Sequence, residues 1–151
     1  MSTAFRPLPP PPPMSRTRGR RPAWVIGFIL YALLMATGTH WPSLRIETPE
    51  LPRADLLVHL CAFGTWTALF LAAGWFGPWN SWRNIAIGHL AAILYAGIDE
   101  ASQGIPGLNR TVAWDDFAFN AIGVWGGTLL VTLVRSWRLE RGERRLSDDS
   151  D

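Results

Sequence analysis

The stretch AWDDFAFNAIGVWGGTLLVTLV, residues 113–134, carries one pair of charges at its beginning, Asp115 and Asp116, and none after it. Three further apolar segments precede it, at residues 23–39, 56–76 and 85–103. Even the shortest, 23–39, would span ~26 Å as an α-helix, close to the thickness of the hydrocarbon core of a bilayer. The sequence therefore predicts an all-α fold, an integral membrane four-helix antiparallel bundle.

Glycines inside these segments fit the same prediction. They would weaken helices in water, but in membrane bundles they let helix backbones approach closely. Gly123 and Gly127, four residues apart in the last segment, are spaced for such a contact. We therefore expect residues 113–134 to pack tightly against a neighbouring helix.

The two ends of the chain differ in composition from the apolar middle. Of the 151 residues 48% are hydrophobic and 17% charged, and the charges and prolines gather at the ends. Residues 1–22 hold the run Pro9 to Pro13 and clustered arginines, which predicts a disordered tail. Residues 135–151 begin basic and end acidic, and this high charge predicts a solvated tail. The domain between them covers residues 23–134.

The arginines predict the orientation of the bundle. All 14 basic residues are Arg, and 11 of them flank the ends of the predicted helices that lie on the side of both termini. The opposite side has only Arg45, Arg53 and Arg110. The positive-inside rule therefore places both termini in the cytoplasm. Because the arginines border membrane spans, we expect anionic lipid as their partner and no nucleic acid. An alternative for residues 23–39 is a cleaved signal peptide, with 36–38 as the cleavage site.

Composition excludes several kinds of chemistry. Without lysine the chain has neither a Schiff-base lysine nor a P-loop lysine, and the single Cys61 excludes a disulfide framework and a cysteine-based metal site. No dedicated metal motif is present either. We therefore expect no metal and no cofactor.

Polar side chains in the predicted spans gather near the outer surface. They form stripes on three helices, at Asp55 and His59, at Asp99, Glu100 and Gln103, and at Asp116 and Asn120. Because intramembrane ionisable groups are costly, side chains at one depth should face one another inside the bundle. Arg110, in the loop before residue 113, can reach over this layer. The eight residues together predict a ligand-binding site, with Glu100, Asp116 and His59 as catalytic candidates if the protein is an enzyme.

Structural roles remain an alternative for several of these residues. Asp115 is expected to serve as a first-turn charge at the start of its helix. His40 is expected at the interface and His89 as a packed histidine. A polar network that only fixes the register of the helices is the alternative for the whole layer.

The ordered polar residues resemble the VanZ family of small multi-pass membrane proteins. The resemblance covers residues 54–134 and rests on Asp55 to His59 with Phe63, on Asp99-Glu100-x-x-Gln103, and on Arg110 with Asp116, Asn120 and Gly123. Leu56 stands where the family usually has lysine. The resemblance implies a bacterial inner-membrane protein, a family linked to glycopeptide (teicoplanin) resistance, and Asp116 rather than Asp115 as the functional carboxylate.

Three functional hypotheses follow from the polar layer. The first is a non-enzymatic protein whose outer-leaflet pocket binds an envelope lipid, a lipid-linked precursor or a glycopeptide. The second is an intramembrane hydrolase or transferase, with Glu100 or Asp116 as a general base and His59 as its partner. The third is an ion-coupled carrier or partner subunit, which with four short helices would require a homo-oligomer.

Overall fold

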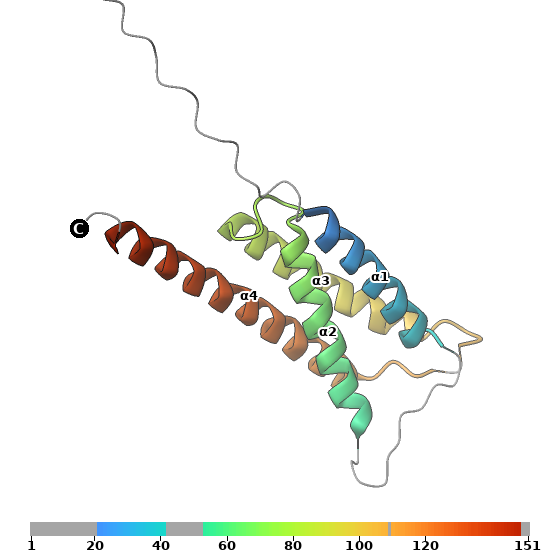
Figure 1. Ribbon diagram of the computed structural model, residues 1–151. Coiled ribbons are helices and arrows are strands. Elements are labelled where there is room, and N and C mark those ends of the chain that lie inside the picture. The colour runs from blue at the N-terminus through green and yellow to red at the C-terminus, as the bar shows by residue number, and fades with distance from the viewer. Residues whose placement is uncertain (1–20, 42–52, 109, 149–151) are drawn as a thin grey trace, which may run out of the picture.

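The computed structural model describes residues 21–41, 53–108 and 110–148, and within these ranges the only regular secondary structure is helical. The helices are α1 (Arg21–Thr39), α2 (Ala54–Ala73), α3 (Trp82–Gln103) and α4 (Trp114–Asp148) (Figure 1). The predicted all-α class is therefore confirmed. Most of the tail predicted to be disordered, residues 1–20, lies outside the described residues.

Helix α4 runs beyond the apolar segment that predicted it. The segment ends at Val134, whereas the helix continues to Asp148, so most of the predicted tail, residues 135–148, is helical. Arg, Leu and Glu in this stretch are good helix formers. Its arginines also contact the turn between α2 and α3: the Arg135 Nε donates to the Asn80 carbonyl oxygen at 2.7 Å, and the Arg138 guanidinium lies 5.1 Å from the centre of the Trp79 ring.

Helices α2 and α4 lie against each other through their glycines. A Cβ placed on Gly64 would be 3.2 Å from the Gly123 carbonyl oxygen. A Cβ on Gly123 would collide with the Leu60 carbonyl oxygen, and one on Gly127 with that of Gly64. The backbones therefore approach more closely than any side chain would allow, which confirms the close contact predicted from the glycine spacing.

An aromatic core fills the space among α1, α2 and α3. Phe63 is completely buried, and the Trp66 ring stacks on Tyr95 with 4.7 Å between ring centres. Phe28 of α1 packs edge-on against Trp66 at 5.1 Å. Stacked and edge-to-face aromatic pairs each add ~0.5–1.5 kcal/mol beyond the area they bury. This core holds α1 to the other helices.

The turn after α2 is built around a buried asparagine. Gly74 ends the helix in the left-handed conformation (φ 69°), which glycine adopts without steric cost. The Asn84 side-chain amide donates to the Leu71 carbonyl oxygen at 2.9 Å, and its Oδ1 accepts from the Phe76 N–H at 3.2 Å. Ser81 caps α3 by accepting from the Asn84 N–H at 3.2 Å.

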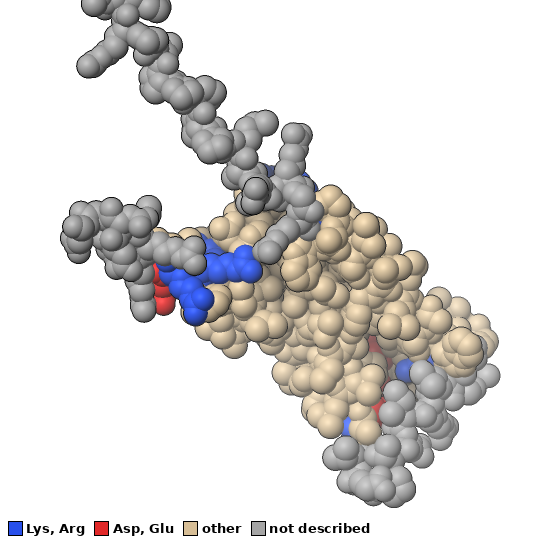
Figure 2. Space-filling view, viewed as in Figure 1, with Lys and Arg blue, Asp and Glu red and all other residues tan. Residues whose placement is uncertain are grey.

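Within the part of the chain that the structure describes, three helices are long and apolar enough to cross a membrane: α1, α2 and residues 114–142 of α4. The fourth predicted span, α3, is not among them, because His89, Asp99 and Glu100 lower its mean hydropathy. Large apolar side chains such as Leu94 and Leu129 are nevertheless exposed along the helices. Figure 2 shows the described charged residues at the two ends of the molecule, with an uncharged surface between them.

Candidate functional site

The end of α1, the beginning of α2, the end of α3 and the beginning of α4 meet at one end of the molecule (Figure 1). Side-chain bonds join them pairwise. The Thr39 hydroxyl donates to Asp99 at 3.1 Å, His59 pairs with Asn120 at 2.9 Å, and Arg53 forms an ion pair with Asp115. Almost all of the polar residues predicted to share one layer therefore lie close together here.

Asp99 lies at the centre of the contacts between α1 and α3. Besides the Thr39 hydroxyl, its carboxylate accepts from the Tyr95 hydroxyl at 3.5 Å and from the Gln103 amide at 3.4 Å. Its side chain is almost fully buried. A buried carboxylate needs such donors because burial without hydrogen bonds is costly. His40 supports the same contact, since its Nε2 lies 2.8 Å from the Ser102 hydroxyl.

Glu100 and Gln103 connect α3 to the segment that leads into α4. The Glu100 carboxylate accepts the Ala113 N–H at 2.8 Å and the Gln103 amide at 3.5 Å. The Gln103 side-chain oxygen in turn accepts from the Arg110 Nε at 2.8 Å. Glu100 and Gln103 are both buried. The two residues thus hold the 110–113 segment over the end of α3 and position the Arg110 guanidinium.

His59 is held in a defined tautomer by α4. Its Nδ1 lies 2.9 Å from the Asn120 side-chain oxygen, which can only accept, so Nδ1 carries a proton. Its Nε2 lies 3.7 Å from the Asp116 carboxylate. Both His59 and Asn120 are buried. Nε2 is therefore the ring atom that can accept a hydrogen bond in the neutral form, or pair with Asp116 when protonated.

Arg53 and Asp115 form the exposed edge of this end. The Arg53 guanidinium pairs with the Asp115 carboxylate, and its Nε lies 3.6 Å from Asp55. The hydrogen bond to Asp115 raises the pKa of Arg53 above its usual value. The Asp115 carboxylate also accepts the Asp116 N–H at 3.2 Å. Asp115 thus makes exposed contacts at the beginning of the helix, while Asp116 is turned toward His59.

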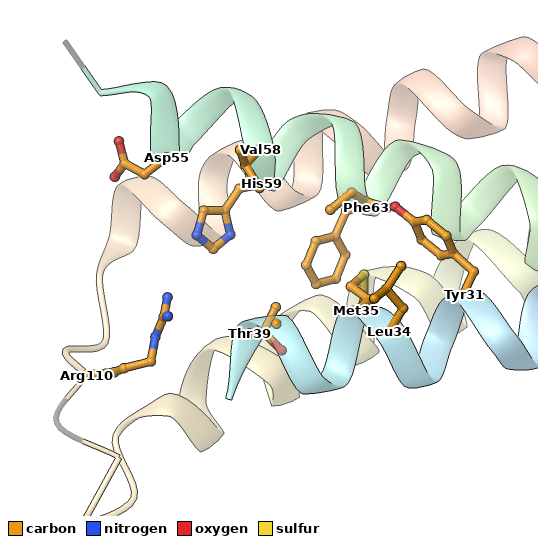
Figure 3. Close-up of a pocket in the computed structure, with 11 residues that line it drawn as sticks. Tyr31, Leu34, Met35, Thr39, Asp55, Val58, His59, Phe63 and Arg110 are labelled. Carbon is orange, nitrogen blue, oxygen red and sulfur yellow. Dashed lines mark hydrogen bonds between the residues drawn. The ribbon is translucent and has the colours of Figure 1, made fainter. Parts of the chain in front are cut away.

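A cavity of about 280 Å³ opens beside these groups (Figure 3). Its polar end is lined by Thr39, Asp55, His59 and Arg110. The rest of its lining is made of aromatic and aliphatic side chains of α1 and α2, namely Tyr31, Leu34, Met35, Val58, Ala62 and Phe63. Figure 3 shows Asp55 and Arg110 toward one end of this space and Tyr31 and Leu34 toward the other, with Val58 beside His59. The cavity is therefore amphipathic.

Two polar atoms beside the cavity have no hydrogen-bond partner among the described residues. They are the Asn120 Nδ2 and the Asp116 Oδ1. Native proteins leave few buried polar atoms unpaired, because each costs ~1–3 kcal/mol. Both belong to side chains that contact His59. The polar cluster therefore retains unused hydrogen-bonding capacity next to the cavity.

The eight predicted site residues fall into three groups. The first group lines the cavity and consists of Asp55, His59 and Arg110. The second group does not line it but contacts the His59 ring, and consists of Asp116 and Asn120. The third group supports Thr39 and the segment that carries Arg110, and consists of Asp99, Glu100 and Gln103. Within the described ranges, no three His, Cys, Asp or Glu side chains form a group that could hold a metal ion. His89 lies elsewhere, with its Nδ1 2.9 Å from the Thr128 hydroxyl.

Thr39 and the apolar wall of the cavity were not predicted as parts of the site. Thr39 is a small hydroxyl at the end of an apolar segment, and nothing in its sequence context distinguishes it from the neighbouring Thr37. Tyr31 and Val58 belong to helices that are apolar on all sides, so the sequence gives no signal for which face lines a cavity.

Comparisons of the chain with models of protein families, with curated proteins and with solved structures find no match. The resemblance of the polar residues to the VanZ family therefore stays a prediction.

Proposed function

We propose that the protein is a membrane-spanning, antiparallel four-helix bundle that binds the headgroup of a cell-envelope lipid or lipid-linked precursor in its polar site. The observation that carries this proposal is the amphipathic cavity, in which Asp55, His59 and Arg110 line one end. Ligand sites are typically concave and mostly apolar, with a few converging polar groups. This cavity has that composition.

The placement in a membrane is supported by the distribution of apolar and charged surface. Exposed leucines and tryptophans surround the helices, and the described charges gather at the two ends. Trp82 begins α3, and Trp137 follows the apolar part of α4, which ends at Val134, as tryptophans at a membrane surface do. With both termini in the cytoplasm, the polar site faces the outer leaflet. The VanZ resemblance implies that this membrane is a bacterial inner membrane.

The charges of the site favour a headgroup over a hydrocarbon ligand. Arg110 offers N–H donors that suit a phosphate or carboxylate, whereas Asp55 and Asp116 suit hydroxyl or ammonium donors. Thr39 and His59 add a hydroxyl oxygen and the imidazole Nε2, which can accept hydrogen bonds from such donors. A phosphate ester that also carries an amine or hydroxyl groups matches this combination.

Two histidines allow a matched test of the headgroup site. His59 and His89 each bond to α4 from another helix, but only His59 lines the cavity. The His59→Gln protein should lose the lipid class that the wild type retains on gentle purification, as measured by native mass spectrometry with lipid identification. His89→Gln, which removes a comparable interhelical bond, should retain that class.

The two variants should behave alike if the site is only structural. Identical lipid profiles for the wild type and both variants would contradict headgroup binding. Equal losses of the lipid class from both variants would also contradict it, because the loss would then follow from a weakened bundle.

An enzymatic role is the second candidate, favoured by the fixed tautomer of His59. Because Asn120 accepts the proton of Nδ1, the lone pair available for proton transfer is on Nε2, which lies 3.7 Å from the Asp116 carboxylate. If the protein hydrolyses or transfers a headgroup, Asp116→Asn should keep affinity for the retained lipid and lose product formation. Unchanged product formation in that variant would contradict this role.

A further inference from the structure

We infer that the cavity takes a single acyl chain of its ligand into an apolar slot between α1 and α2, entered sideways from the lipid. This inference rests on the proposed headgroup site and specifies the ligand as an amphiphile held by both its parts. The slot is defined by Leu34, Met35, Val58, Ala62 and Phe63, between the polar end and Tyr31.

The floor and the mouth of the slot differ in exposure. Met35 is 6% exposed and Phe63 is fully buried, so both lie at the floor. Leu34 is 69% exposed and Val58 44% exposed, although both line the same cavity. Side chains that face a cavity and the outside at once mark its opening. The slot therefore opens between α1 and α2, toward the surface where lipid would lie.

The slot has a closed inner end and a defined length. The Tyr31 hydroxyl donates to the Ala62 carbonyl oxygen at 3.1 Å and bridges the two helices there. Eight residues separate Tyr31 from Thr39 on α1, and eight separate Phe63 from Asp55 on α2, so each wall is ~12 Å long. A straight chain can lie along such a wall with its headgroup beside His59.

The size and surroundings of the slot specify the kind of chain. A volume of about 280 Å³ is just below the ~300–1,000 Å³ of typical small-molecule sites, which favours one chain over two. A water-soluble headgroup would leave the apolar walls uncovered. Because lipid tails are as apolar as leucine, the slot adds little affinity for a chain already in the membrane. It instead selects the ligand by shape and orients its headgroup.

Two glycines of α1 give a matched pair of variants. Gly38 lines the cavity and Gly27 does not, and a Cβ on either one meets nothing within 4 Å. Both lie inside the helix, where leucine is the better helix former. Gly38→Leu should therefore put a side chain into the cavity, where the slot meets the polar end, without disturbing the fold, and Gly27→Leu should change only the outer surface of the helix.

The test is photolabelling in phosphatidylcholine nanodiscs by lysophosphatidylethanolamine with a diazirine in its single chain. Peptide mass spectrometry should find the label on Leu34, Met35 and Val58 above its level on exposed Leu129 of α4. Gly38→Leu should lower the slot label about tenfold or more, because the leucine side chain takes up space that the acyl chain would occupy, and Gly27→Leu should leave it unchanged. A wild-type label spread evenly over α4 and the slot, or one indifferent to Gly38→Leu, would overturn the inference.

Two further arms separate the slot from the headgroup site. If the slot label persists in His59→Gln but falls in Gly38→Leu, the slot stands and the headgroup proposal fails. Glycerophosphoethanolamine has the headgroup without a chain. If this compound displaces the labelled lysophosphatidylethanolamine from the wild-type protein, while the diazirine label is spread evenly over the slot and α4, the headgroup site stands and the slot is refuted.

Discussion

Asp99 accepts hydrogen bonds from three side chains of two helices, and only one of these donors, Thr39, comes from α1. Thr39 and Thr37 form a natural comparison, because the Thr37 hydroxyl donates at 2.8 Å to the Leu33 carbonyl oxygen of its own helix and is exposed. Thr39→Val should lower the free energy of unfolding by about 1 kcal/mol, since a buried carboxylate loses a donor. Thr37→Val should change it by less than ~0.5 kcal/mol.

Reversible unfolding of the purified protein in mixed micelles would measure both values. Equal effects of the two substitutions would contradict the contact between α1 and Asp99.

The sequence could single out residues such as His59, Glu100 and Asp116 as members of a polar layer, because charged and polar side chains are rare in an apolar segment. It could not predict which side chains they contact. The pairing of His59 with Asn120 rather than with Asp55, one turn away on its own helix, depends on how α2 and α4 are rotated against each other. The Arg110 Nε donates to the Gln103 side-chain oxygen, a pairing that the sequence spacing does not indicate. Hydropathy carries no information on that rotation.

At the scale of elements, the contact between α2 and α4 depends on glycines that face each other's backbone. Gly127 and Gly126 are neighbours, but only a Cβ at Gly127 would collide with the Gly64 carbonyl oxygen. Gly127→Ala should destabilise the protein by about 1–3 kcal/mol, because a backbone atom cannot move aside as a side chain can. Gly126→Ala should be neutral or stabilising, since alanine is the better helix former.

Thermal unfolding of both alanine variants, in the detergent used for the wild type, would separate them. A Gly127→Ala protein as stable as the Gly126→Ala protein would contradict the close approach of the two helices.

The existence of the four helices could be predicted more closely than their ends. Helix α3 begins at Trp82, three residues before its apolar segment, because Ser81 caps it. Helix α4 continues past Val134 because its arginines and glutamates are good helix formers. An apolar segment marks the part of a helix that suits a membrane, whereas capping and propensity decide where the helix stops.

At the scale of the whole molecule, the start of α1 and the end of α4 lie at one end and the polar site at the other (Figure 1). Arginines of the first end contact the turn between α2 and α3, where Arg21 donates to the Gly74 carbonyl oxygen at 3.1 Å and the Arg135 guanidinium lies 4.5 Å from the centre of the Trp82 ring. The excess of arginine at this end predicts that it stays in the cytoplasm. The proposed lipid site then lies on the outer side.

The central claim, a polar site on the outer side of a membrane-spanning protein, is tested most directly by cysteine labelling in intact cells. Thr111→Cys, exposed beside the site, and Ser136→Cys, exposed on α4 near the opposite end, would each be placed in a Cys61→Ser background. A membrane-impermeant maleimide should label Thr111→Cys directly and Ser136→Cys only after the membrane is permeabilised. Labelling of Ser136→Cys in intact cells with Thr111→Cys protected, or equal labelling of both, would contradict the claim.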